Sequence, residues 1–124
     1  MTQASAIFDL AFGLFHLAFW RMFGWPRSLA PAGRVNRAVT QALNIMLAYV
    51  FFLFGIALFL APSFPLLCAG AGFWLLRLLI QPLLFGPNSR LGLVFMVLFA
   101  AGATLHIAAA SSYPSARVVI PLSG

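Results

Sequence analysis

Charged side chains are scarce in this sequence. Its 124 residues include seven basic residues, all of them arginines, and one acidic residue, Asp9. Charged residues make up 6% of the chain and apolar residues 64%, whereas soluble domains average roughly 25% and roughly 45–50%. A water-soluble fold of this size needs many more polar side chains on its surface. The composition therefore excludes a soluble enzyme and a disordered tail.

Cysteine is also scarce, and the common catalytic motifs are missing. Cys68 is the single cysteine, so the chain forms no disulfide within itself and has no Cys-x-x-Cys pair. The sequence contains no P-loop, no Gly-x-Gly-x-x-Gly motif and no His-Glu-x-x-His motif. We therefore expect a protein that is not an enzyme and that needs no metal and no cofactor.

The first residues lack the features of a targeting peptide. Residues 1–5 carry no basic group, and no small-residue cleavage site follows a short apolar core. We expect the first apolar run to stay in the mature protein. The net charge of +6 would suggest nucleic acid as the partner of a soluble protein. Here the arginines fall mainly between apolar runs, where they act as topology signals, so we expect no nucleic-acid partner.

Long apolar runs are abundant. A helix needs about 20 mainly apolar residues to cross a hydrocarbon layer of roughly 30 Å. None of the runs alternates with a period of two, and backbone groups inside lipid must satisfy one another, so helices are predicted. The runs that qualify are residues 6–25, 37–61, 65–86 and 90–111. Short loops between them predict an all-α polytopic membrane protein, an up-down bundle of four transmembrane helices in one domain over residues 1–124.

Arginines in the short loops predict the orientation of this bundle. Those on one side of the membrane are Arg21, Arg27, Arg34, Arg37 and Arg90. Only Arg117 falls on the other side. Because arginine-rich short loops stay in the cytoplasm, we predict a protein of the bacterial inner membrane with both termini on the non-cytoplasmic side.

Five polar side chains are predicted to converge within the bundle. Counted from the arginine-rich ends at 1.5 Å per residue, His16, Asn44 and Arg77 each lie roughly 11–12 Å deep. Gln41 and Gln81 lie one turn closer to the cytoplasm. We call these five residues the inner cluster. Ionisable groups inside a membrane are candidates for function, so the inner cluster is the predicted ligand site.

Arg77 leaves several interpretations of the inner cluster open. No carboxylate lies at its depth, and a buried guanidinium without an anion is costly. Arg77 can bind helix carbonyls or extend to lipid phosphates, while the amides join the helices. It can instead hold a ligand such as a lipid phosphate, a quinone or a carboxylate. A proton relay through His16 is a third interpretation.

A second polar pair is predicted near the outer edge of the membrane. Asp9 lies fifteen residues from Gly24, and His106 lies sixteen residues from Arg90, so their depths are similar. We expect a structural ion pair between them, and no metal site with Cys68. His16 and His106 differ in depth by roughly 12 Å, so they cannot ligate one haem.

Small and aromatic residues predict how the helices contact one another and the lipid. Residues 69–72 and 100–103 are patches of alanine and glycine, which predict close contacts between helices. Trp20, Trp25 and Trp74 suit an interfacial or a packing role. The fourteen phenylalanines suit faces that contact lipid or partner helices.

Several segments of the chain resemble those of small four-span bacterial membrane proteins. They are Phe15-His16-Leu17-Ala18-Phe19-Trp20-Arg21, Asn36-Arg37-Ala38-Val39, Gln41-Ala42-Leu43-Asn44, Phe73-Trp74-Leu75-Leu76-Arg77 and Gln81-Pro82. The resemblance covers most of the chain and implies no particular activity. The architecture is more loosely similar to that of DoxX-like proteins. The chain is also similar in size to small multidrug-resistance transporters, although Asp9 lies nearer the membrane edge than their acidic residue.

Two functions are expected from these observations. The first is a non-enzymatic membrane subunit or a lipid- or quinone-interacting protein, in which Arg77 contacts the polar group of the ligand. Its partners would be the lipid bilayer, other membrane subunits or a second copy of the chain. The alternative is a small proton-coupled or anion-binding transporter that uses Asp9, His16 and Arg77.

Overall fold

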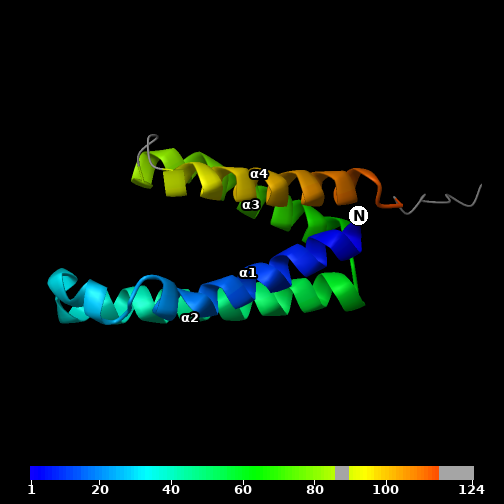
Figure 1. Ribbon diagram of the computed structural model, residues 1–124. Coiled ribbons are helices and arrows are strands. Elements are labelled where there is room, and N and C mark those ends of the chain that lie inside the picture. Colours follow the sequence, from blue (N-terminus) through cyan, green and yellow to red (C-terminus); the bar gives the residue numbers. More distant parts are fainter. Residues whose placement is uncertain (86–89, 115–124) are drawn as a thin grey trace, which may run out of the picture.

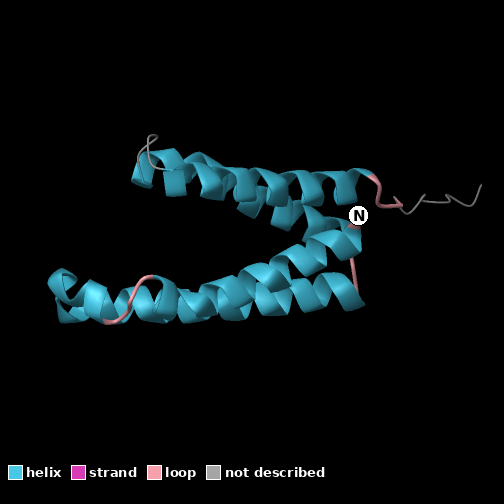
Figure 2. Cartoon of the chain, in the orientation of Figure 1, coloured by secondary structure: helices cyan, strands magenta, loops and turns pink. Residues whose placement is uncertain are grey.

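The chain is helical throughout the part that the computed structural model describes, residues 1–85 and 90–114. Its elements are α1 (Thr2–Met22), the short 3₁₀ helix η1 (Arg27–Ala32), α2 (Gly33–Leu60), α3 (Phe64–Phe85) and α4 (Arg90–Ser111). Each of the four α-helices is long and apolar enough to cross a membrane. The all-α prediction and the four candidate spans are therefore confirmed. Figure 2 shows the same helices joined by short connections.

The first two helices differ most from the predicted spans, and α1 begins at Thr2, four residues before the predicted start. α1 ends at Met22, before the predicted residue 25, and α2 begins at Gly33, before the predicted residue 37. Gly24 (φ +62°) and Gly33 (φ +79°) both adopt the left-handed conformation, which glycine tolerates without a steric penalty. These two glycines bracket η1. The 28 residues of α2 extend roughly 42 Å, so its first turns reach beyond a hydrocarbon layer of roughly 30 Å.

The helices form two antiparallel hairpins that meet at one end (Figure 1). The first hairpin consists of α1 and α2, and the second of α3 and α4. Their backbones approach each other mainly where α1 packs against α4, whereas α2 and α3 meet through side chains such as Phe51 on α2 and Trp74 on α3. The hairpins converge near the N-terminus and diverge toward η1. The arrangement thus differs from a closed four-helix bundle, because it is wedge-shaped and open at the arginine-rich end.

Burial is inverted relative to a water-soluble protein. The buried polar residues are Ser5, Asp9, His16, Asn44, Gln81 and His106. Large aliphatic side chains are exposed instead, including Leu83 at 82%, Leu60 at 75% and Val35 at 73%. Soluble proteins place these residue types the other way round. The outer faces of the helices therefore suit contact with lipid.

Glycines allow the second hairpin to close tightly. A Cβ atom on Gly102 would lie 2.6 Å from Cδ2 of Trp74, and one on Gly70 would lie 2.7 Å from Nε2 of His106. Real Cβ atoms do not approach other heavy atoms so closely. The predicted close helix contacts at the two small-residue patches are confirmed at these positions.

Candidate ligand cavity between the two hairpins

Asp9, Trp74 and His106 join the hairpins at their converging end. His106 Nε2 lies 3.0 Å from Asp9 Oδ2, and Trp74 Nε1 donates a 3.1 Å hydrogen bond to Asp9 Oδ1. All three side chains are at most 1% exposed. We call them the outer polar contact. Sequence reasoning paired Asp9 with His106, and the structure places them together, but it did not anticipate the hydrogen bond from Trp74.

Hydrogen bonding also fixes where His106 carries a proton. Nδ1 of His106 lies 2.8 Å from the carbonyl oxygen of Gly102. A carbonyl oxygen only accepts, so Nδ1 must donate. Nε2 then either donates to the Asp9 carboxylate or accepts from a protonated Asp9 carboxyl. In both cases the pair has no net charge, which is the state that burial favours.

His16 and Asn44 form a second link, this one within the first hairpin. His16 Nδ1 lies 2.8 Å from Asn44 Oδ1, and Asn44 Nδ2 donates a 2.8 Å hydrogen bond to the His16 carbonyl oxygen. Because Asn44 Oδ1 accepts, His16 Nδ1 must carry the hydrogen. Nε2 of His16 makes no hydrogen bond within the described residues. The neutral ring therefore has an acceptor nitrogen available.

The other two amides of the inner cluster lie apart from this pair. Gln41 Oε1 accepts a 3.2 Å hydrogen bond from Trp20 Nε1, and its Nε2 donates to the Arg37 carbonyl oxygen. Gln81 is 1% exposed, and neither polar atom of its side chain has a hydrogen-bond partner among residues 1–85 and 90–114. Neither glutamine lines the cavity described next. The inner cluster is thus not one connected network, because its residues belong to two hairpins that diverge at this depth.

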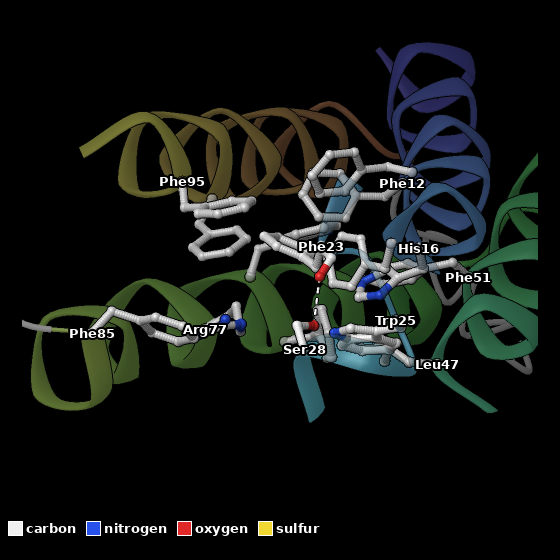
Figure 3. Close-up of a pocket in the computed structure, with 15 residues that line it drawn as sticks. Phe12, His16, Phe23, Trp25, Ser28, Leu47, Phe51, Arg77, Phe85 and Phe95 are labelled. Atoms are coloured by element: carbon white, nitrogen blue, oxygen red, sulfur yellow. Dashed lines mark hydrogen bonds between the residues drawn. The ribbon is translucent and has the colours of Figure 1, made fainter. Parts of the chain in front are cut away.

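A cavity of about 460 Å³ lies between the hairpins. This volume falls within the roughly 300–1,000 Å³ of typical small-molecule sites. Figure 3 shows His16 on α1 and Arg77 on α3 facing it from opposite hairpins. The residues that line it are Phe12, Phe15, His16, Phe19, Phe23, Trp25, Ser28, Leu47, Phe51, Phe73, Trp74, Arg77, Phe85, Phe95 and Phe99.

The walls of the cavity are mainly aromatic. Phe12, Phe51, Trp74 and Phe99 belong to the buried core where the hairpins meet, and they close the cavity at its inner end. The ring centroids of Phe12 and Trp74 are 4.7 Å apart, in the edge-to-face geometry that aromatic pairs prefer. At the other end, the cavity reaches Ser28 on η1. The cavity is therefore a blind pocket that extends toward the open end of the wedge.

Arg77 is the one basic side chain with a permanent charge in the lining. Its guanidinium carbon lies 4.6 Å from the ring centroid of Phe99 and 5.6 Å from that of Phe85. These are cation–π distances. Within the described residues the guanidinium makes no hydrogen bond and no ion pair. The N–H donors of Arg77 are therefore not used by any described residue, and the side chain lines the cavity between the hairpins.

The aromatic lining is the feature that sequence reasoning missed. Phenylalanines were expected on faces toward lipid or partner helices, yet several line the cavity. A pattern in the first helix does indicate this arrangement: Phe8, Phe12, Phe15 and Phe19 follow one another at spacings of four, three and four. Each directly precedes a member of the stripe Asp9, Gly13, His16 and Trp20. Successive residues lie about 100° apart around a helix, so these two adjacent stripes together form one broad face of the first helix.

Metal binding finds no support in the described part of the chain. No group of three His, Cys, Asp or Glu side chains there could hold a metal ion. Cys68 is exposed, whereas Asp9 and His106 are buried and paired.

Two parts of the chain that the topology prediction used lie outside the described residues. They are Arg117 and the connection over residues 86–89.

Comparison with known proteins gives no relative. No family model and no curated protein matches the sequence, and no solved structure matches the fold. The resemblance to DoxX-like proteins therefore stays a prediction, and the function has to be argued from the cavity alone.

Proposed function

We propose that this chain is a non-enzymatic multi-pass membrane protein that binds a membrane amphiphile, a lipid or a quinone, between its two hairpins. One observation carries the proposal. The 460 Å³ cavity combines an aromatic lining with two polar side chains, His16 and Arg77, that have unused hydrogen-bonding capacity. An apolar pocket with a few convergent polar groups is the usual form of a small-molecule site.

The polar groups restrict the chemistry of the ligand. The Arg77 guanidinium offers donors, and Nε2 of a neutral His16 offers an acceptor. Aromatic cavities also bind quaternary ammonium groups, but the positive charge of Arg77 repels such a ligand. We therefore propose an apolar ring system or acyl chain with a head group that accepts hydrogen bonds.

Binding is favoured over transport by the closed end of the cavity. At the end where the hairpins converge, the hydrogen bonds of the outer polar contact join α1 to both helices of the second hairpin. A transporter would have to break these buried interactions to open a path to the other side. The small proton-coupled or anion-binding transporter therefore remains the second candidate, without an observation that favours it.

The setting of the protein follows from the arginine distribution. We propose that it lies in a bacterial inner membrane with both termini on the non-cytoplasmic side, so that the cavity opens toward the cytoplasmic leaflet. The exposed aliphatic faces of the helices suit lipid, other membrane subunits or a second copy of the chain as neighbours.

Fluorescence of Trp74 tests the proposal. Trp74 lines the cavity and is 1% exposed, so a quencher in bulk lipid does not reach it. In the variant Trp20→Phe/Trp25→Phe, Trp74 is the sole tryptophan and is excited selectively at the red edge of the tryptophan absorption band. Brominated single-chain amphiphiles, added to this variant in nanodiscs, should quench Trp74 saturably at near-stoichiometric amounts.

A matched control uses a fluorophore outside the cavity. In Trp25→Phe/Trp74→Phe the remaining Trp20 does not line the cavity, and its quenching should rise without saturation as the amphiphile partitions into lipid. Non-saturable quenching of Trp74, parallel to that of Trp20, would overturn the proposed function.

A further inference from the structure

The geometry points to a carboxylate on a single long apolar chain as the group that Arg77 binds in this cavity. This inference rests on the proposed function and names the ligand class more narrowly. It follows from the charges of the chain, the surroundings of Arg77, the arginines at the open end and the size of the cavity.

The chain supplies no acidic side chain that could neutralise Arg77. Asp9 is its single acidic residue. Both oxygens of that carboxyl are engaged in the outer polar contact, with Trp74 and His106. A guanidinium in a low-dielectric cavity without an anion is costly, and an anionic ligand removes this cost. A neutral head group does not.

The surroundings of Arg77 prepare it for a carboxylate. The nearby rings of Phe85 and Phe99 attract the positive charge without using the N–H donors, since the interaction is with the ring faces. A guanidinium held in this way presents a planar fork of donors. Such a fork binds a carboxylate through two parallel hydrogen bonds.

Further arginines surround the open end of the wedge. Arg21, Arg27, Arg34 and Arg90 are exposed, and Arg37 is half-buried. In the described residues the only ion pair is between His106 and Asp9, so these arginines add to a positive field at the entrance. Such a field raises the local concentration of anions and speeds their association. It complements an anionic amphiphile that enters from the same leaflet.

The size of the cavity favours one apolar chain. Its volume of about 460 Å³ lies in the lower half of the range for small-molecule sites, roughly 300–1,000 Å³. A single chain or ring system fits such a space, whereas a phospholipid with two acyl chains is larger. A lipid phosphate is therefore an outcome of the test and not the ligand inferred here.

The experiment compares a carboxylate with its neutral ester. Dibromostearate and its methyl ester are titrated into the Trp20→Phe/Trp25→Phe protein in nanodiscs of zwitterionic lipid, at a pH at which the carboxylate is ionised. Charge-assisted hydrogen bonds are roughly twice as strong as neutral ones, so we expect the carboxylate to bind about 10- to 100-fold more tightly than the ester, a difference of about 1.4–2.8 kcal/mol.

Variants assign this difference to Arg77. In Arg77→Gln the carboxylate should bind no more tightly than the ester, because the loss of the guanidinium weakens binding of the ionised head group far more than binding of the neutral one. Arg77→Lys keeps the charge but loses the fork, and should retain part of the preference. Arg34→Gln removes an exposed arginine at the same end of the molecule and should retain most of it.

The outcomes separate this inference from the proposed function. Saturable quenching with equal affinities for acid and ester would contradict the inference of a carboxylate ligand, while the proposed amphiphile site would remain supported. Non-saturable quenching by both would overturn both. If the carboxylate still binds more tightly than the ester in Arg77→Gln, Arg77 is not the group that binds it. Arg77 has no specific role either if Arg34→Gln abolishes the difference between carboxylate and ester to the same extent. If a brominated phosphatidate binds more tightly than dibromostearate, the head group that Arg77 binds is a phosphate and the inference of a carboxylate is wrong.

Discussion

At the scale of residues, the chain separates its few charges into two kinds. Asp9 is neutralised by His106 and held by Trp74, so it joins helices. Arg77 has no such partner among the described residues and faces the cavity. The single acidic residue is thus engaged in contacts between helices, whereas the half-buried Arg77 is the basic residue that we propose binds a ligand.

Substitution of Asp9 should separate its structural role from a role in proton transfer. Asp9→Ala leaves the donor of Trp74 and the Nε2 atom of His106 buried without partners. Breaking a buried pair in this way costs about 3–5 kcal/mol. We expect a loss of this order in the free energy of unfolding, measured by reversible denaturation in mixed micelles.

Asp9→Asn is the matched variant. Its amide oxygen can accept from Trp74, and its NH₂ group can donate to Nε2 of a neutral His106, so both partners stay satisfied. We expect most of the stability to be retained and the binding of the brominated amphiphile to be unchanged. Equal losses of stability in Asp9→Ala and Asp9→Asn would show that the charge itself is required.

The position of a residue along its helix axis was predictable from the sequence, but which helices pack together was not. Counting residues placed Asp9 near His106 and His16 near Asn44, and the structure has hydrogen bonds between both pairs. The same counting grouped Gln81 with His16, although Gln81 does not line the cavity. A residue count gives position along a helix axis, whereas contact across helices depends on which hairpins pack together.

At the scale of elements, the glycines of α3 have different roles. Gly70 is buried against His106, whereas nothing lies within 4 Å of a Cβ atom built on Gly72. The two positions share a helix and lie two residues apart, so they form a matched pair. Sequence alone indicated a contact patch over residues 69–72 but could not tell which glycine faces α4.

Substitution of the two glycines by alanine tests this packing. Gly70→Ala should destabilise the protein by about 1–3 kcal/mol, because the buried ring of His106 would have to move. Gly72→Ala should leave the free energy of unfolding unchanged or raise it by up to about 1 kcal/mol, since alanine favours helix. The same micelle denaturation measures both, and a larger loss in Gly72→Ala would contradict the packing of α3 on α4.

At the scale of the whole molecule, two helical hairpins form a wedge with a cavity between them. The four candidate spans were predictable because lipid imposes long apolar helices. The wedge was not, because two hairpins with apolar outer faces are equally compatible with a closed bundle. The outer polar contact joins the hairpins at one end of the molecule, and aromatic rings line the cavity between them.

Thiol labelling tests the proposed orientation. Cys68 is exposed near the start of α3, at the end where the hairpins converge. A membrane-impermeant maleimide should label it from the non-cytoplasmic side of intact cells. In Cys68→Ser/Ala30→Cys the thiol lies on η1, at the opposite end, and should be labelled only after the cells are opened. The reverse pattern would place the open end of the wedge on the outside.

The most direct measurement of the central claim is the response of the Arg77 side chain to a carboxylate. With ¹⁵N-labelled arginine in nanodiscs, the Nε–Hε signal of Arg77 is identified as the one that disappears in Arg77→Gln. On addition of oleate this signal should shift saturably, while those of the exposed arginines change little. An unchanged Arg77 signal, or equal shifts of the exposed arginines, would contradict a carboxylate site in the cavity.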